Sequence, residues 1–316
     1  MEINRALLND FFNGLDERSR KALDSAVTKV VETKKKNGKV AVVTGSGPNI
    51  HEGVTTLIAE LIGKGIIDGV TTSSAVINHE MGGALDRVKM CDASQFGLDR
   101  TKMPRGNVFE FTDLSEEETD ILRKEMLLDE DLLKKGKSAE GRMVIKAAGN
   151  MAYPMGLRTE KIAEEILTLS RLSGLPFETI AGWGCDSRTM LGIGAEKGVP
   201  VLVTIPQMVG GGHVGLAVGD SISVAERSKR IADMLGKADV IIESAVALTQ
   251  EIHDGPFETY TGHGIWSWWQ GQPVYSLEKK TLIRFDLDEN LRLAQDLQRE
   301  SSMIQEAIDK GLPKTK

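Results

Sequence analysis

The clearest indication of the fold is the segment Lys39-Val-Ala-Val-Val-Thr-Gly-Ser-Gly-Pro-Asn-Ile-His-Glu-Gly53. A short run rich in valine breaks into a turn of glycine, serine and proline, and an apolar pattern at helical spacing follows from Val54 to Lys64. This succession is typical of a parallel β-strand followed by an α-helix. Glycines in such a turn let backbone N–H groups approach a ligand, and the next helix directs its positive N-terminal end toward an anion. A phosphate or a dinucleotide is therefore the first ligand to consider.

The turn alone does not identify its ligand. Gly45 and Gly47 match the first two glycines of the G-x-G-x-x-G fingerprint, but Ile50 stands where the third glycine belongs. A tight strand-to-helix turn of any α/β protein explains the stretch about as well. The residues of this turn that we predict to bind a cofactor are Gly45, Ser46, Gly47, Pro48 and Asn49.

Composition excludes several classes of protein. The chain has 316 residues, of which 41% are hydrophobic and 27% charged, so it can bury a substantial core. Its net charge of -7 argues against a nucleic-acid-binding surface, which needs an excess of clustered Lys and Arg. Two cysteines, Cys91 and Cys185, are too few for a disulfide framework. The sequence shows neither a secretory signal pattern nor a long apolar run, so we expect a cytoplasmic location and no membrane span.

The order of elements predicts the architecture. Residues 1–37 show apolar side chains at helical spacing and form an N-terminal helical extension, which either packs on its own domain or reaches a neighbouring subunit. Residues 38–316 form a single α/β domain, with residues 84–140 as an insertion or covering flap. Apolar runs at residues 66–72, 199–205 and 238–243 alternate with helical patterns. This alternation predicts a doubly wound, mostly parallel, Rossmann-like sheet.

Small polar residues follow several of these strands. In an open parallel sheet the ligand crevice lies outside the carboxyl ends of the strands, so these turns are expected to face one site. The further residues that we predict to bind the cofactor are Thr71, Thr72, Ser73, Ser74, Gly211, Gly212 and Ser244.

The five histidines are concentrated in glycine-rich or turn-like segments. Histidine titrates near neutral pH and can act as an acid, a base or a ligand, so this distribution favours a polar active site. Turns also tolerate polar residues without any function, and that alternative stays open. The candidates for acid–base catalysis are His79, His213 and His253.

Residues 251–270 hold three of the four tryptophans. Aromatic side chains beside acidic ones suit a small cationic or planar ligand, although tryptophan is equally common at subunit interfaces. The residues that we predict to bind the substrate are Glu80, Glu251, Asp254, His263 and Trp266.

Metal and thiol chemistry are weaker alternatives. His253 and Asp254 with His263, or His51 with Glu52, could hold a metal, but the chain contains no H-E-x-x-H spacing, so we predict no metal. No local signature marks Cys185 as a nucleophile, and a structural thiol is the preferred interpretation.

The passage Gly65-Ile-Ile-Asp-Gly-Val-Thr-Thr-Ser-Ser-Ala-Val76 resembles the NAD-binding strand and turn of deoxyhypusine synthases. Together with residues 44–48 and 238–245 it is also similar to the NAD-binding domain of archaeal-type ornithine cyclodeaminases. The resemblance implies a deoxyhypusine synthase-like fold, NAD as cofactor, and a homodimer or homotetramer with sites at subunit contacts. The synthases carry a catalytic lysine after a Trp-Gly pair, whereas no lysine follows Trp266 before Lys279 here. We therefore expect an activity other than deoxyhypusine formation.

These observations lead to one functional prediction and two alternatives. The prediction is an NAD-dependent enzyme that acts on a small amine or amino acid. The first alternative is a noncatalytic nucleotide-binding or regulatory protein of the same fold, and the second is a metal-dependent hydrolase.

Overall fold

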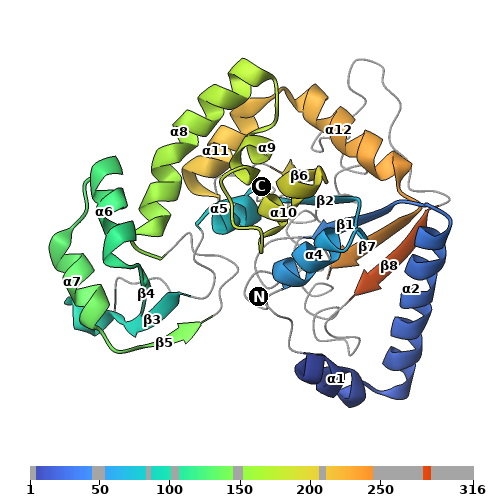
Figure 1. The fold of residues 1–316 in the computed structure, drawn as a ribbon, viewed down its shortest axis with the longest axis horizontal. Coiled ribbons are helices and arrows are strands. Elements are labelled where there is room, and N and C mark those ends of the chain that lie inside the picture. Colours follow the sequence, from blue (N-terminus) through green and yellow to red (C-terminus); the bar gives the residue numbers. More distant parts are fainter. Residues whose placement is uncertain are drawn as a thin grey trace, which may run out of the picture.

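The computed structural model describes residues 5–44, 54–82, 87–99, 101, 107–144, 152–205, 211–244 and 280–285. Its central feature is a five-stranded sheet with the order β6-β2-β1-β7-β8 (Figure 1). All four neighbouring pairs are parallel, which confirms the predicted α/β class with a parallel sheet. The strands are β1 (Val40–Thr44), β2 (Gly69–Ser73), β6 (Val201–Ile205), β7 (Val240–Ser244) and β8 (Thr281–Phe285).

Helices cover both faces of the sheet. Successive side chains of a strand point to opposite faces, and β1 shows this directly. Val42 packs with Ile58 of α4, whereas Ala41 and Val43 pack with Ile231 of α12. The cluster around Val42 contains residues of α4 (Val54–Gly63), α5 (Ser74–Met81), α8 (Met155–Ser173), α9 (Phe177–Gly182), α10 (Met190–Lys197) and α11 (Gly212–Ser221). The opposite face is packed against α12 (Val224–Lys237), so the sheet is doubly wound.

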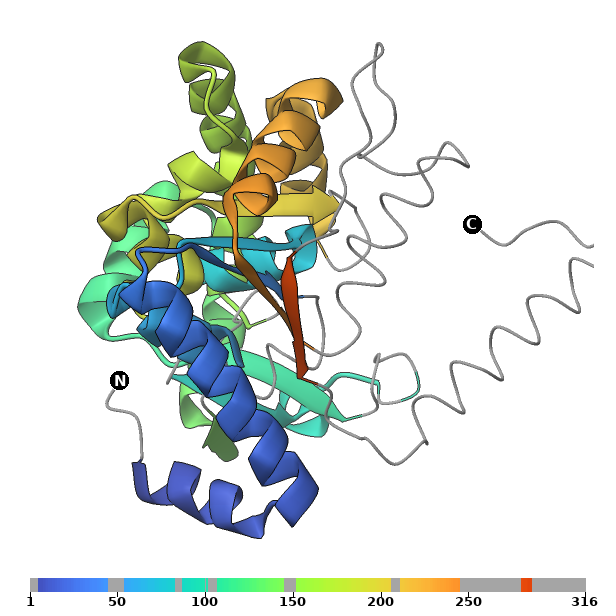
Figure 2. The same ribbon diagram turned by 90° about the vertical axis from the view of Figure 1, so that its right-hand side faces the viewer.

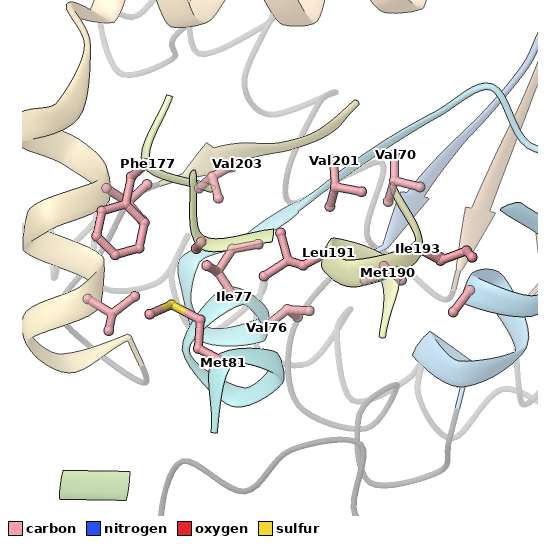
Figure 3. Packing of buried hydrophobic residues seen from close by; sticks show 14 of the residues in the cluster. Val70, Val76, Ile77, Met81, Phe177, Met190, Leu191, Ile193, Val201 and Val203 are labelled. Atoms are coloured by element: carbon pink, nitrogen blue, oxygen red, sulfur yellow. The ribbon is translucent and has the colours of Figure 1, made fainter. Parts of the chain in front are cut away.

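The core beside β2 and β6 is centred on a short helix that the sequence did not reveal. In α5 all residues except His79 are buried, so the helix has no polar stripe and no amphipathic period. Figure 3 shows Val76, Ile77 and Met81 of α5 among Leu191 and other apolar side chains of this cluster. A substitution in α5 therefore alters the packing of the core directly.

The predicted N-terminal helices are present as α1 (Arg5–Gly14) and α2 (Glu17–Lys35). Asp16 caps α2 by accepting a hydrogen bond of 2.7 Å from the N–H of Ser19. Ala26 and Val30 of α2 pack against Val40 and Ile283 of the sheet. The second half of the extension thus packs on its own domain, and a contact of α1 with a neighbouring subunit stays a prediction.

A second, antiparallel sheet with the order β4-β3-β5 lies beside the first (lower left in Figure 1). Its core is built around Phe111, Leu122 and Leu133. Ser115 and Glu118 form a capping box at the start of α6. The elements of this unit are β3 (Val88–Asp92), η1 (Ala93–Phe96), β4 (Val108–Thr112), α6 (Glu116–Glu125), α7 (Glu130–Ser138) and β5 (Gly141–Val144).

This unit extends past residue 140, because β5 pairs with β3 through Val144 and Tyr153 joins the core. The antiparallel sheet therefore includes residues on both sides of position 140, and the bounds 84–140 of the insertion stay a prediction. A role of the unit as an insertion or flap stays a prediction.

Lys89 is buried inside this unit and holds the end of α7. Its Nζ donates hydrogen bonds to the carbonyl oxygens of Gly136 (3.0 Å), Lys137 (3.2 Å) and Ala139 (3.2 Å). The last carbonyls of a helix have no intrahelical donor, so an ammonium group there satisfies them and opposes the negative end of the helix dipole. The Phe111 ring lies 5.8 Å from Nζ, a cation–π distance.

Figure 2 shows the molecule from the side, with α1 and α2 at the edge opposite α11 and α12. Among the described helices, none is long and apolar enough to span a membrane.

Candidate functional site at the carboxyl edge of the sheet

The strand order places a topological switch point between β1 and β7. The chain leaves β1 through α4 on one face to reach β2, whereas it arrives at β7 through α12 on the other face. Ligands of open α/β sheets bind outside the carboxyl ends of the strands at such a point. Thr44 and Ser244, the last residues of β1 and β7, are register partners there. The candidate site therefore lies at the edge formed by Thr44, Ser244 and the neighbouring end of β2.

The end of β2 carries three buried hydroxyl groups. Thr71, Thr72 and Ser73 are each 0% exposed. Within the described residues, no hydrogen-bond partner lies near the side-chain oxygen of any of the three. Buried polar atoms are paired in the great majority of cases, so unpaired ones in a row need a cause. A ligand or ordered water at the end of β2 would provide partners.

Two helices begin at this same edge. β1 and β2 are adjacent and parallel, and α4 and α5 start after them, so both helix N-termini lie at the carboxyl edge. Ser73 is the N-cap residue of α5, but its side chain makes no capping hydrogen bond. Positive helix ends with unused N–H groups favour an anion.

Thr55 is a further candidate that the sequence analysis did not identify. It lies in the first turn of α4 and is 1% exposed, and its Oγ1 has no hydrogen-bond partner among the described residues. The available signal was a threonine pair at the start of a helix that follows a glycine-rich turn. Its burial depends on tertiary packing, which the sequence pattern does not show.

Asn78 connects α5 to the start of α11. Its Nδ2 donates a hydrogen bond of 3.0 Å to the carbonyl oxygen of Gly211, the residue that precedes α11. Gly212 has a positive φ of 55°, a conformation that glycine adopts without a steric penalty. The predicted cofactor residues Gly211 and Gly212 are thus tied to the helix that follows Ser73.

The N-terminus of α11 already has a carboxylate beside it. Glu160 of α8 accepts a hydrogen bond of 2.9 Å from the backbone N–H of His213. A second carboxylate, Glu164, lies 3.0 Å from His213 Nε2. An added anion would meet these negative charges, so α4 and α5 are better anion sites than α11.

The structure places the two described histidines in helices rather than in turns. His213 lies in the first turn of α11, and its ring contacts α8. His79 is half-buried in the last turn of α5. Their predicted catalytic roles stay predictions.

Glu80, which we predicted to bind the substrate, is engaged within the core. It is 1% exposed, and its two oxygens accept hydrogen bonds of 2.9 Å from the backbone N–H groups of Met190 and Leu191. Burial raises the pKa of Glu80 to about 7, although the two N–H donors act in the opposite direction. Glu80 thereby joins α5 to the N-terminus of α10, and its role with the substrate stays a prediction.

Cys185 has the properties of a structural thiol. Its Sγ donates a hydrogen bond to the carbonyl oxygen of Ala181 at 3.2 Å. Burial raises the pKa of the thiol, and the carboxylates of Glu80 and Asp186 raise it further. A raised pKa disfavours the reactive thiolate.

Other predicted site residues lie outside the described part of the chain. These are the cofactor residues Gly45, Ser46, Gly47, Pro48 and Asn49, the catalytic candidate His253, and the substrate residues Glu251, Asp254, His263 and Trp266. Where the chain is described, no group of three or more His, Cys, Asp or Glu side chains is placed to hold a metal ion.

Comparison with known families found no family model that matches the chain, and comparison with curated proteins found no match. Solved structures with a similar arrangement include AgrE in its ternary complex with ornithine and NAD+ (TM-score 0.42, 12% identity, 87% of this chain and 28% of AgrE). They also include apo ArgZ, an arginine dihydrolase from cyanobacteria (TM-score 0.37, 11% identity, 72% of this chain and 24% of ArgZ). A third is a conserved putative LOR/SDH protein from Methanococcus maripaludis S2 (TM-score 0.38, 11% identity, 73% of this chain and 52% of that protein).

The chain thus matches between about a quarter and a half of the length of these three proteins. The class of the chain itself is that of an α/β protein with a doubly wound parallel sheet, as its own strands show. The resemblance to deoxyhypusine synthases stays a prediction.

Proposed function

We propose that the chain is an NAD-dependent enzyme that acts on a small amine or amino acid. The observation that carries this proposal is the group of buried, unpaired hydroxyls at the carboxyl edge of the sheet, above all Thr55 and Ser73. Thr55 lies in the first turn of α4, and Ser73 is the N-cap residue of α5, which follows the strand adjacent to β1. A dinucleotide combines an anionic pyrophosphate with many hydrogen-bonding groups, and it therefore suits both features of the edge.

The residues that would hold the cofactor come from several strand ends. Thr55 and Ser73 would donate hydrogen bonds, and the N-termini of α4 and α5 would favour the negative charge. The bound nicotinamide would supply a hydride acceptor. The proposed set is completed by Thr71, Thr72, Ser74, Gly45, Ser46, Gly47, Pro48, Asn49, Gly211, Gly212 and Ser244.

The proposed acid–base groups lie close to these elements along the chain. His79 belongs to the helix that starts at Ser74, and His213 follows Gly212. Either imidazole, or that of His253, would hold the proton that the amine or hydroxyl of the substrate releases. Glu251 and Asp254 would bind a cationic substrate by charge.

Cofactor binding is tested by thermal unfolding of the purified full chain with and without NAD or NADP. At a ligand concentration of 100 Kd we expect a stabilisation of about 2.7 kcal/mol. If neither dinucleotide raises the midpoint of unfolding at saturation, the cofactor proposal is wrong. A rise with NAD but no turnover of any amine or amino acid would instead favour the noncatalytic alternative. Replacement of His213 by Asn separates the two further, because an enzyme should lose turnover while it keeps its affinity for NAD.

A further inference from the structure

A cavity lies at the amino edge of the sheet, opposite the carboxyl edge and under α12. Its volume is about 360 Å³, which is within the range of small-ligand pockets, about 300–1,000 Å³. Strands of five residues separate it from the carboxyl edge by roughly 16 Å. Ligand sites of doubly wound sheets lie at the carboxyl edge, so this cavity is separate from the proposed cofactor site.

The wall of the cavity is apolar. The strands contribute Ala41, Gly69 and Leu202, and α12 contributes Met234 and Ala238. Gly69 matters for the shape, because a Cβ atom at this position would collide with Sδ of Met234. An aliphatic group fits such a wall.

The rim of the cavity carries charges of both signs, and most of them are paired within the protein. Lys39 Nζ lies 3.2 Å from Asp68 Oδ1, and Arg230 Nε lies 2.8 Å from Glu226 Oε1. Asp233 and Lys237 also line the cavity. These two are available to contact a bound molecule.

Asp233 and Lys237 are four residues apart on α12, the spacing at which an acidic and a basic side chain commonly form an ion pair. The structure shows no ion pair between them, and neither is paired with another described residue. Both side chains are exposed at the mouth of the cavity. One positive and one negative group therefore stand unpaired beside an apolar wall.

We propose that this cavity binds a free α-amino acid with an aliphatic side chain. Lys237 pairs with its carboxylate, Asp233 pairs with its ammonium group, and the side chain packs against Met234 and Leu202. The site is not catalytic, and it does not depend on the proposed function at the carboxyl edge.

The probe for this site is L-leucine, measured by isothermal titration calorimetry with the full chain. Two comparison ligands each lack one charge: 4-methylpentanoate has no ammonium group, and 3-methylbutylamine has no carboxylate. We expect each to bind at least about tenfold more weakly than L-leucine, because each leaves one charged hydrogen bond unmade. Equal binding of L-leucine and either comparison ligand would overturn the proposal.

Variants locate the site. Asp233→Asn and Lys237→Gln should each weaken L-leucine binding by about tenfold or more. Lys229→Gln, on the same helix but outside the cavity lining, should leave it unchanged. All three positions are exposed, so the fold is expected to persist, and thermal unfolding checks this. Absence of L-leucine binding to the unmodified chain, or unchanged binding in both cavity variants, contradicts the proposal.

Discussion

Arg227 and Glu178 form an ion pair inside the protein, with 2.6 Å between Nη1 and Oε1. Their side chains are 3% and 0% exposed. The pair also satisfies the backbone of Val203 in β6: Glu178 accepts its N–H at 3.0 Å, and Arg227 donates to its carbonyl oxygen at 3.3 Å. β6 ends the order of described strands, so its outer side has no strand partner there. Two charged side chains from α9 and α12 thus take the place of a neighbouring strand at this position.

Removal of one member should be strongly destabilising. Arg227→Met leaves the Glu178 carboxylate buried without its counter-charge, and we expect a loss of about 3–5 kcal/mol in the free energy of unfolding. Urea unfolding followed by circular dichroism measures it. Arg158→Met is the control, because its partner Glu125 and Arg158 itself are about one-third exposed, and it should cost no more than about 1 kcal/mol. Similar losses in the two variants would contradict the role assigned to burial.

Substitution of Thr55 or Ser73 by an apolar residue should affect stability and NAD binding in opposite directions. Thr55→Val and Ser73→Ala each remove a buried oxygen that has no partner in the described residues. We expect the free energy of unfolding to stay the same or rise by about 1 kcal/mol, because an unsatisfied polar group is lost. We expect the affinity for NAD to fall by about tenfold, because a bound ligand loses a hydrogen bond.

The control for these variants is Thr119→Val. Thr119 is equally buried, but its Oγ1 donates to the carbonyl oxygen of Ser115 at 2.7 Å, in the unit with the antiparallel sheet. This change should destabilise the protein and leave NAD binding unaffected. If Thr55→Val and Ser73→Ala both retain full affinity, the carboxyl edge of β2 is not part of the cofactor site.

Glu80 should make stability depend on pH. Its pKa is about 7 in the folded chain against an ordinary value of 4.5, so the folded state binds a proton more tightly than the unfolded state does. The stabilisation from this proton is complete below about pH 4.5 and is lost as the pH rises through about 7. The full effect is on the order of 3 kcal/mol.

The measurement is the free energy of unfolding from pH 4.5 to 8 for the unmodified chain and for Glu80→Gln. Glutamine does not titrate, so its cost is constant across this range, while other groups titrate alike in both proteins. The free energy of unfolding of the unmodified chain should therefore fall relative to that of Glu80→Gln as the pH rises. A difference that is independent of pH would show that Glu80 does not change its protonation here.

Lys89 should be necessary for the unit with the antiparallel sheet. Lys89→Met keeps the aliphatic stem but leaves three carbonyl oxygens at the end of α7 without their shared donor. We expect a loss of about 1–3 kcal/mol in the free energy of unfolding. Lys134→Met, on the exposed side of the same helix, should change it by no more than about 0.5 kcal/mol. If Lys89→Met left the free energy of unfolding unchanged, water would have to replace the ammonium group as the donor.

The sequence predicts the parallel sheet well, because its strands are buried on both faces and are read as continuous apolar runs. The strand expected at residues 199–205 is observed as Val201–Ile205, and that at 238–243 as Val240–Ser244. At the edge of the sheet, β8 pairs in parallel with β7. Local apolar content decides where a strand forms, whereas its neighbour depends on distant residues.

The missed elements have physical causes. α5 is buried nearly all round, so its sequence lacks helical periodicity. β3 carries two charged residues, Lys89 and Asp92, among its five residues, so its sequence is not a continuous apolar run. Asp186 and Ser187 are residue types that commonly cap helices, but α10 is capped by Thr189, whereas Asp186 pairs with Arg188. At the site, the hydroxyls of residues 71–73 could be predicted from their place after a strand. The burial of Thr55 and the hydrogen bonds that Glu80 accepts from the start of α10 could not be predicted, because both depend on helices from other parts of the chain.

The strand order has a consequence for synthesis of the chain on the ribosome. β1 is hydrogen-bonded to β2, which follows soon after it, and to β7, where Lys39 N–H donates to Asp239 across 200 residues of sequence. Until that distant segment has left the ribosome, one edge of β1 has unpaired backbone groups, and Ala41 and Val43 lack their contacts with α12. Contacts of such sequence separation form slowly, so the nascent chain passes through a period in which chaperones can bind it.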